Sequence, residues 1–156
     1  MLHSEKIRIL LVNDDKRVCD VLGLILESRG YDVDVAHTGD EAIEKSKTNA
    51  YNLAVLDTGL PDIESKKLLR AMHESSPKMI RIIGTEIIRL QDALDAFNDC
   101  ADGCFANPVE PGRLISLIEE KLEEQKDAKT AREKSQELTS GAKRRNFYRN
   151  NDLEKN

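Results

Sequence analysis

Short apolar runs alternate along this chain with longer segments in which apolar residues recur every three or four positions. The short runs predict buried strands, and the periodic segments predict amphipathic helices. The predicted strands cover residues 7–12, 31–36, 53–57, 79–85 and 104–106, and the predicted helices cover residues 16–29, 38–49, 65–74, 90–100 and a last segment that begins near residue 111. Such alternation is typical of an α/β fold, in which helices cover a parallel sheet.

Three local signals support these helix boundaries. Gly30 stands where the first helix would end in a left-handed turn, a conformation that glycine adopts readily. Thr38 and Glu41 have the spacing of a capping box at a helix start. Pro111 suits the first turn of the last helix, because its missing N–H would have no helical partner there.

Acidic residues follow two of the predicted strands. Asn13-Asp14-Asp15 comes directly after the first strand, and Asp57 ends the third. In a flavodoxin-like, doubly wound (βα)5 fold with a five-stranded parallel sheet in the order 2-1-3-4-5, these two strands are neighbours whose ends share one rim. We therefore expect Asp14 and Asp57 to face each other, and they would repel unless a cation lay between them.

This pair of carboxylates predicts a Mg²⁺ site. Mg²⁺ needs only one or two protein carboxylates and completes its shell with water and phosphate oxygens. Asp57 can also act as a nucleophile toward phosphorus, and the hydroxyl of Thr85, at the end of the fourth strand, can donate to a phosphoryl oxygen. The simpler alternative is that Asp14 and Asp15 only cap the following helix.

Composition sets broad limits on the protein. A chain of 156 residues, 39% hydrophobic and 34% charged, has room for one globular domain and an appendage. No apolar stretch approaches the roughly 20 residues that cross a bilayer, and the first residues lack a signal-peptide core, so we expect a cytosolic protein. The three cysteines form no C-x-x-C pair and are odd in number, which argues against a disulfide framework.

Charge divides the chain near residue 124. Residues 1–124 hold 15 Lys and Arg against 24 Asp and Glu, whereas residues 125–156 hold 9 against 5. The acidic body argues against direct nucleic-acid binding by the domain. The basic cluster at residues 143–149 includes two aromatic residues, and it is either a weak contact arm for an acidic partner, such as nucleic acid or a membrane face, or a solvated, disordered end.

We therefore predict a domain over residues 5–124 and a basic tail over residues 125–156. The apolar stripe of the last helix thins after Leu122, which leaves too few apolar residues for a second core. Good helix formers prolong the helix to Ser140-Gly141, where we predict that it ends and that disorder begins.

Four sequence motifs carry a resemblance to a known family. They are Ile-Leu-Leu-Val-Asn-Asp-Asp at 9–15, Leu-Asp-Thr-Gly-Leu-Pro-Asp at 56–62, Ile-Ile-Gly-Thr at 82–85 and Ala-Asp-Gly-Cys-Phe-Ala-Asn-Pro at 101–108. Together with the five strand–helix units, they make residues 7 to about 124 resemble the CheY-like receiver domain of two-component response regulators. Each motif alone would be a weak signal, but the set is specific.

The resemblance implies a phosphorelay function that depends on Mg²⁺. Asp57 is similar to the family's phosphoacceptor, which takes a phosphoryl group from a histidine kinase or phosphotransfer protein. Asp14 resembles the metal-binding acid, Gly59 stands where a backbone carbonyl completes the metal shell, and Thr85 matches the switch hydroxyl. The family also implies a signalling module rather than an enzyme, with self-directed phosphotransfer and dephosphorylation, and output to a downstream protein through the fourth helix, fifth strand and fifth helix.

Three departures from the family pattern change the charge of the site. The first acid of the metal-binding pair is Asn13 here, so that Asn13 or Asp15 becomes the candidate for an additional metal ligand. The family's lysine before the proline is Asn107, which removes the cation that would pair with the phosphoryl group. Glu86 follows Thr85, where the family usually has a small residue, and adds negative charge.

Two further departures concern shape. Ser65 replaces a glycine that helps form the loop after Asp57. The position of the family's switch aromatic falls on Cys104, with Phe105 beside it. The resemblance also suggests a cis peptide bond between Asn107 and Pro108.

Two hypotheses follow for the same fold. In the first, Asp57 is phosphorylated and switching is weakened; in the second, a degenerate receiver binds its partner regardless of phosphate. Retention of Asp14, Asp57 and Thr85 favours the first. Because the segment after residue 124 is too short to form a DNA-binding domain, we expect a stand-alone regulator.

Two other functional classes fit less well. Haloacid-dehalogenase-like phosphatases need a second acid in an Asp-x-Asp pattern, which Asp57-Thr58-Gly59 lacks. A flavin carrier of this topology needs a hydroxyl-rich phosphate loop after the first strand, where this chain has acids instead.

Overall fold

The computed structural model describes residues 6–86 and 101–154, with side chains up to residue 140. It contains a parallel sheet of five strands in the order β2-β1-β3-β4-β5. The strands are β1 (Arg8–Val12), β2 (Asp32–Ala36), β3 (Leu53–Asp57), β4 (Ile80–Glu86) and β5 (Gly103–Asn107). The helices are α1 (Lys16–Ser28), α2 (Gly39–Thr48), α3 (Ser65–Ser75) and α5 (Pro111–Glu154). The predicted fold class and strand order are confirmed.

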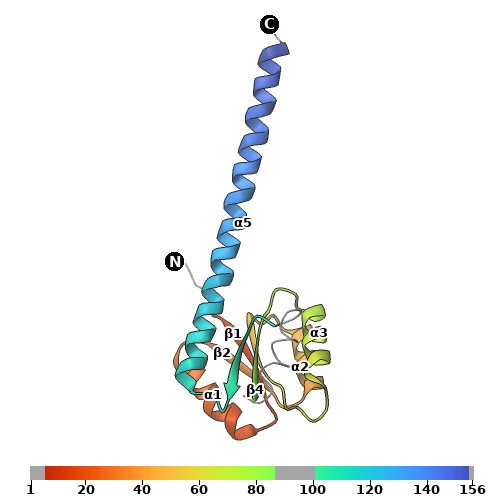
Figure 1. The fold of residues 1–156 in the computed structure, drawn as a ribbon, viewed down its shortest axis with the longest axis vertical. Coiled ribbons are helices and arrows are strands. Elements are labelled where there is room, and N and C mark those ends of the chain that lie inside the picture. Colours follow the sequence, from red (N-terminus) through yellow and green to blue (C-terminus); the bar gives the residue numbers. More distant parts are fainter. Residues whose placement is uncertain (1–5, 87–100, 155–156) are drawn as a thin grey trace. The chain divides into compact units, whose positions relative to one another are not determined.

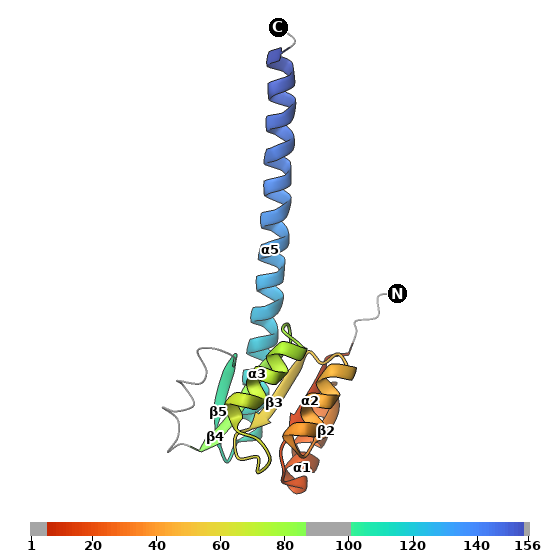
Figure 2. The same ribbon diagram turned by 90° about the vertical axis from the view of Figure 1, so that its right-hand side faces the viewer.

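Helices cover both faces of this sheet because its central strands are apolar on both faces. Helix α1 and the first turns of α5 lie on one face, and α2 and α3 lie on the other (Figures 1 and 2). Strands β1 and β3 are almost wholly buried, as expected for parallel strands covered on two sides. The core on the α2 and α3 side includes Leu10, Val12, Leu56, Leu68, Leu69, Met72 and Ile83.

The predicted boundaries agree with the observed elements within one or two residues. Gly30 has a positive φ of 91°, as its place after α1 requires. Thr38 caps α2 by accepting from the N–H of Glu41 at 3.1 Å, but the Glu41 carboxylate accepts from the N–H of His37 rather than from that of Thr38. The reciprocal half of the capping box is therefore shifted by one residue. The helix predicted at 90–100 lies outside the described residues.

The chain divides into two compact units, Met1–Ile118 and Glu119–Asn156. Helix α5 is continuous through Ser140 and Gly141, so the predicted helix end at this pair is wrong. One glycine costs a helix about 1 kcal/mol relative to alanine, which good helix formers on both sides can offset. Within the described part of the chain, none of the helices combines the length and the apolar character that crossing a bilayer requires.

Candidate functional site

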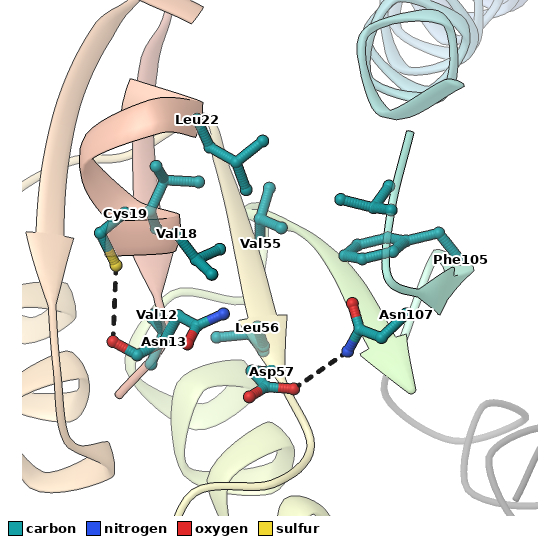
Figure 3. Close-up of a pocket in the computed structure, with 12 residues that line it drawn as sticks. Val12, Asn13, Val18, Cys19, Leu22, Val55, Leu56, Asp57, Phe105 and Asn107 are labelled. Atoms are coloured by element: carbon teal, nitrogen blue, oxygen red, sulfur yellow. Dashed lines mark hydrogen bonds between the residues drawn. The ribbon is translucent and has the colours of Figure 1, made fainter. Parts of the chain in front are cut away.

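Side chains from three neighbouring strands meet at the carboxyl end of the sheet. Asp57, the last residue of β3, is paired in register with Gly84 of β4, which is paired in turn with Phe105 of β5. Side chains alternate between the faces of a strand, so Asp57, Phe105 and Asn107 point to the same face. The amide nitrogen of Asn107 donates to Oδ1 of Asp57 at 3.2 Å (Figure 3). Two of the candidate site residues named from the sequence, Asp57 and Asn107, are therefore in direct contact.

The Asp57 carboxyl group is half-buried and has neutral hydrogen-bond donors. Burial raises its pKa, and the negative charge of Asp14 raises it further. Hydrogen bonds from the main-chain N–H groups of Gly59 and Thr58 and from the Asn107 amide lower the pKa, but they only partly offset the increase. The group is therefore a carboxylate that gains from a nearby cation.

Gly84 makes room for the aromatic ring beside Asp57. A Cβ atom at this position would lie 2.5 Å from two ring atoms of Phe105 and 3.2 Å from Oδ1 of Asn107. Only a residue without a side chain allows the ring to pack so closely over β4. Gly84 thus helps to place both residues of β5 that flank Asp57.

A small cavity of about 30 Å³ lies next to Asp57, which forms part of its wall. It has room for water but is far smaller than the pockets of about 300 Å³ or more that hold organic ligands. Three polar residues line it, Asn13, Asp57 and Asn107, together with apolar residues from α1, β1, β3 and β5, among them Val18, Cys19, Val55 and Phe105 (Figure 3).

The loop after β1 carries the other predicted metal ligands, and we call residues 13–15 the acidic loop. The side-chain oxygen of Asn13 accepts from the N–H of Asp15 at 2.8 Å. Asp15 caps α1, because its Oδ1 accepts from the N–H of Arg17 at 2.9 Å and from that of Val18 at 3.4 Å. The capping alternative is therefore confirmed for Asp15. Asp14 is exposed, and its charge acts on Asp57.

The loop after β3 is held by hydrogen bonds at both ends, and we call residues 58–64 the phosphoacceptor loop because they follow Asp57, the phosphoacceptor that the sequence predicts. The N–H of Thr58 donates to the carbonyl oxygen of Gly84 at 3.1 Å. The hydroxyl of Ser65 donates to the carbonyl oxygen of Thr58 at 3.0 Å, a bond that glycine at this position would lack. Gly59, the predicted carbonyl ligand, is exposed in this loop next to Asp57.

Thr85 lies on the other face of the sheet from Asp57. It follows Gly84, the register partner of Asp57, and is 2% exposed. Strand alternation therefore turns its side chain away from the Asp57 carboxylate. Glu86 is exposed at the end of β4 and pairs in register with Asn107. The peptide bond between Asn107 and Pro108 is cis.

The donor set suits a Mg²⁺ ion that keeps part of its water. Among the described residues, no three His, Cys, Asp or Glu side chains form a metal cluster. Mg²⁺ does not need such a cluster, since one or two carboxylates, a carbonyl oxygen and water suffice. Asp57, half-buried and influenced by the charge of Asp14, can supply one of these carboxylates, and the largest causes of its pKa shift include no cation.

Sequence reasoning missed two residues that contact the acidic loop from the side. Nδ1 of His37 lies 3.0 Å from the carbonyl oxygen of Asn13, and Sγ of Cys19 lies 3.4 Å from the same oxygen. No spacing signal pointed to them, because their contacts depend on how the loop after β2 and the first turn of α1 meet the acidic loop. The glycine of the Ile-Ile-Gly-Thr motif, which is Gly84, was a sequence signal for the close packing at the end of β4.

Comparison with known proteins decides the family. The profile of the response regulator receiver domain matches residues 9–119. The chain belongs to this family. Receiver domains are signalling modules, and members of the family are typically Mg²⁺-dependent. The family also implies a kinase partner.

Individual relatives agree with this assignment. A CheY-like receiver domain from Methanospirillum hungatei JF-1 is 37% identical, with a TM-score of 0.75, and the match covers 80% of this chain and 99% of that one. The regulatory protein VanRB of Enterococcus faecalis is 32% identical over 113 residues, 72% of this chain and 51% of the relative. The transcriptional regulatory protein TrcR of Mycobacterium tuberculosis is 30% identical over 112 residues, 72% of this chain and 44% of the relative. The receiver chain thus spans about half the length of the curated relatives that it matches.

Proposed function

We propose that this receiver domain accepts a phosphoryl group on Asp57 in a Mg²⁺-dependent reaction. One observation carries the proposal: a half-buried carboxylate ends β3 with neutral donors around it and the charge of Asp14 acting on it. Such a carboxylate is poised both to bind a hard cation and to attack phosphorus. The donor is a histidine kinase or a phosphotransfer protein, as the family implies.

The residues of the site have separable roles in this reaction. An oxygen of Asp57 attacks phosphorus, the new P–O bond forms as the P–N bond to the donor histidine breaks, and the electron pair of that bond leaves with the imidazole nitrogen. Asp14, Asp57 and the carbonyl of Gly59 would hold Mg²⁺, which supplies charge neutralisation for the phosphoryl oxygens. The N–H groups of Gly59 and Thr58 orient the carboxylate. Thr85 serves as the switch hydroxyl only if its side chain turns toward the phosphoryl group.

Asn107 weakens the site relative to a lysine in the same place. An amide donates a neutral hydrogen bond, whereas a lysine would donate a charge-assisted one that is worth roughly 1 kcal/mol more. The amide keeps a donor near the phosphoryl position but supplies no positive charge. We therefore expect slower phosphotransfer than a lysine would support, and weaker switching.

The decisive experiment uses a small-molecule phosphodonor with Mg²⁺. We expect a base-labile mass increase of one phosphoryl group on the wild type and none on Asp57→Asn. An unmodified wild type, or an equal adduct on Asp57→Asn, would refute phosphorylation at this residue. Omission of Mg²⁺ with a chelator should abolish the adduct.

A degenerate receiver is the second candidate function. It is favoured by the contact between Asn107 and Asp57, which satisfies one carboxylate oxygen without phosphate or metal. In that case partner binding would be unchanged by Asp57→Asn and by the phosphodonor. A large loss of partner binding in Asp57→Asn would exclude it.

We further propose the limits and contacts of the functional unit. Residues 5–124 form the receiver, and output to a downstream protein uses the face of the fourth helix, β5 and α5, of which the fourth helix lies outside the described residues. Residues 125–156 form a basic extension whose contacts, including weak ones to nucleic acid, are separate from the site. Deletion of this extension should leave phosphorylation of Asp57 unchanged.

A further inference from the structure

The start of α2 lies between the two loops that carry the proposed metal ligands. On one side His37, two residues before α2, contacts the acidic loop. On the other side, the first residues of α2 contact Asp62 in the phosphoacceptor loop. Neither His37 nor Asp62 is a proposed ligand, yet His37 contacts the loop that contains Asp14, and Asp62 belongs to the loop that contains Gly59.

His37 fixes the main chain at Asn13, one residue before Asp14. Its Nδ1 lies 3.0 Å from the carbonyl oxygen of Asn13. A carbonyl oxygen can only accept a hydrogen bond, so Nδ1 must carry a proton and is the donor in this contact. The same carbonyl oxygen accepts from Sγ of Cys19 at 3.4 Å, and the N–H of Asn13 donates to the carbonyl oxygen of Ala36 at 3.0 Å. The peptide groups that precede Asp14 are therefore held on both sides.

Asp62 fixes the phosphoacceptor loop on the N-terminus of α2. Its two carboxylate oxygens accept separately from the N–H of Gly39 at 3.0 Å and from the N–H of Asp40 at 3.1 Å. These bonds lower the pKa of Asp62, with the bond from Gly39 as the largest cause. The carboxylate is therefore ionised at neutral pH and suits the positive end of the helix dipole.

Close packing at Gly39 shows that this docking is tight. A Cβ atom on Gly39 would clash with the side chain of Ile63, the neighbour of Asp62 in the phosphoacceptor loop. Gly39 is buried although it is the first residue of a surface helix. The loop and the helix start are thus in direct contact, with little freedom to slide.

We infer that the start of α2 is a positioning device for the metal site, in which His37 holds the acidic loop and Asp62 holds the phosphoacceptor loop. The inference rests on the proposed function, because it concerns the Mg²⁺ that Asp14, Asp57 and Gly59 would bind. Mg²⁺ demands near-ideal octahedral geometry, so its affinity depends on the relative placement of ligands from different loops. Residues that orient metal ligands typically change metal affinity by roughly 10- to 100-fold when they are removed.

Matched substitutions test the inference in the full-length chain. His37→Asn retains an N–H donor at the distance of Nδ1 from the backbone, whereas His37→Leu has the same size and no donor. Asp62→Asn likewise retains one acceptor oxygen, and Asp62→Leu retains none. Calorimetric titration with MgCl₂ gives the dissociation constant of each variant, and urea unfolding without Mg²⁺ gives its stability.

We expect the two leucine variants to bind Mg²⁺ about tenfold more weakly than the wild type, in line with other residues that orient metal ligands. The asparagine variants should recover most of the affinity, and His37→Leu should differ from His37→Asn in affinity more than in stability. Equal Mg²⁺ affinities for the leucine and asparagine variants would overturn the inference while the proposed function stands. A wild type that binds no Mg²⁺ would overturn both.

Discussion

The amide nitrogen of Asn107 lies 3.2 Å from Oδ1 of Asp57 and donates a hydrogen bond to it. The contact joins the end of β5 to the end of β3 across the end of β4, at the position where the resemblance to the family led us to expect a lysine. It gives the carboxylate a partner that neither repels a metal ion nor neutralises a phosphoryl group. If the site works as we propose, its chemistry should therefore depend more on Mg²⁺ than it would with a lysine.

Asn107→Lys should accelerate phosphorylation of Asp57. A charge-assisted hydrogen bond exceeds a neutral one by roughly 1 kcal/mol, which corresponds to about a fivefold faster transfer if the gain appears in the transition state. The rate of adduct formation with a small phosphodonor, measured by mass spectrometry, tests this. Asn107→Ala, which lacks any donor, should be slower than the wild type. An unchanged rate in Asn107→Lys would mean that residue 107 does not contact the phosphoryl group.

Asp57→Asn should stabilise the metal-free protein at neutral pH. Burial raises the pKa of Asp57 above its ordinary value of 3.8, with Asp14 adding to the effect. A group with a raised folded-state pKa contributes stability below its unfolded pKa and loses that contribution as pH rises through the folded pKa. The ionised carboxylate therefore destabilises the fold near pH 7, and the advantage of Asp57→Asn should shrink as pH falls toward 3.8.

Urea unfolding of both proteins over this pH range, without Mg²⁺, measures the difference. Added Mg²⁺ should stabilise the wild type by about 2.7 kcal/mol at 100 times the dissociation constant, and Asp57→Asn much less. A wild type more stable than Asp57→Asn at pH 7 without metal would contradict the pKa argument.

Gly84→Ala should destabilise the domain by roughly 1–3 kcal/mol, the usual range for overpacking. The added methyl group would have to displace the ring of Phe105, which lies 2.5 Å from the Cβ position. Gly23→Ala in α1 is the matched control, because no atom lies within 4 Å of its Cβ position. That control should gain about 1 kcal/mol from helix propensity. Similar unfolding free energies for the two variants would show that the ring at residue 105 yields easily.

Tyr51→Phe should cost about 1 kcal/mol of stability. The buried Tyr51 donates its hydroxyl hydrogen to Oδ2 of Asp34 at 2.6 Å, and the Arg8 guanidinium lies 5.1 Å from the ring centroid. Burial and the negative charge of Asp34 raise the pKa of Tyr51, so the hydroxyl stays protonated and donates throughout the ordinary pH range. In an Asp34→Ala background the same substitution should have a much smaller effect, which chemical unfolding of the four proteins would show.

The sequence was most informative where the conformational or burial preference of a residue acts locally. Given the strand order of a doubly wound fold, buried runs ending in Asp57 and in Asn13-Asp14-Asp15 predicted a shared rim, because parallel strands place their carboxyl ends together. Gly30 and Thr38 predicted helix ends through conformational preferences that act locally. These signals depend little on the rest of the chain.

Contacts between loops were beyond such reasoning. His37 and Asp62 each contact a residue that is 24 or 23 positions away in the sequence, respectively, and no local pattern encodes such contacts. The helix end predicted at Ser140-Gly141 failed because the propensity of a single glycine is weaker than that of its neighbours. The face on which Thr85 lies follows from strand register, which apolar runs without alternation do not define.

The contact between Cys19 and the carbonyl of Asn13 has a practical consequence for spectroscopy. Cys19 is 2% exposed, and burial raises the pKa of its thiol to about 11. Since the thiolate is the reactive form, maleimide dyes and spin labels should leave this native cysteine unmodified at neutral pH. Once Cys100 and Cys104 are replaced by serine, a probe attached to a cysteine introduced on the outer surface of α1 can report motions of the acidic loop without any change to Cys19.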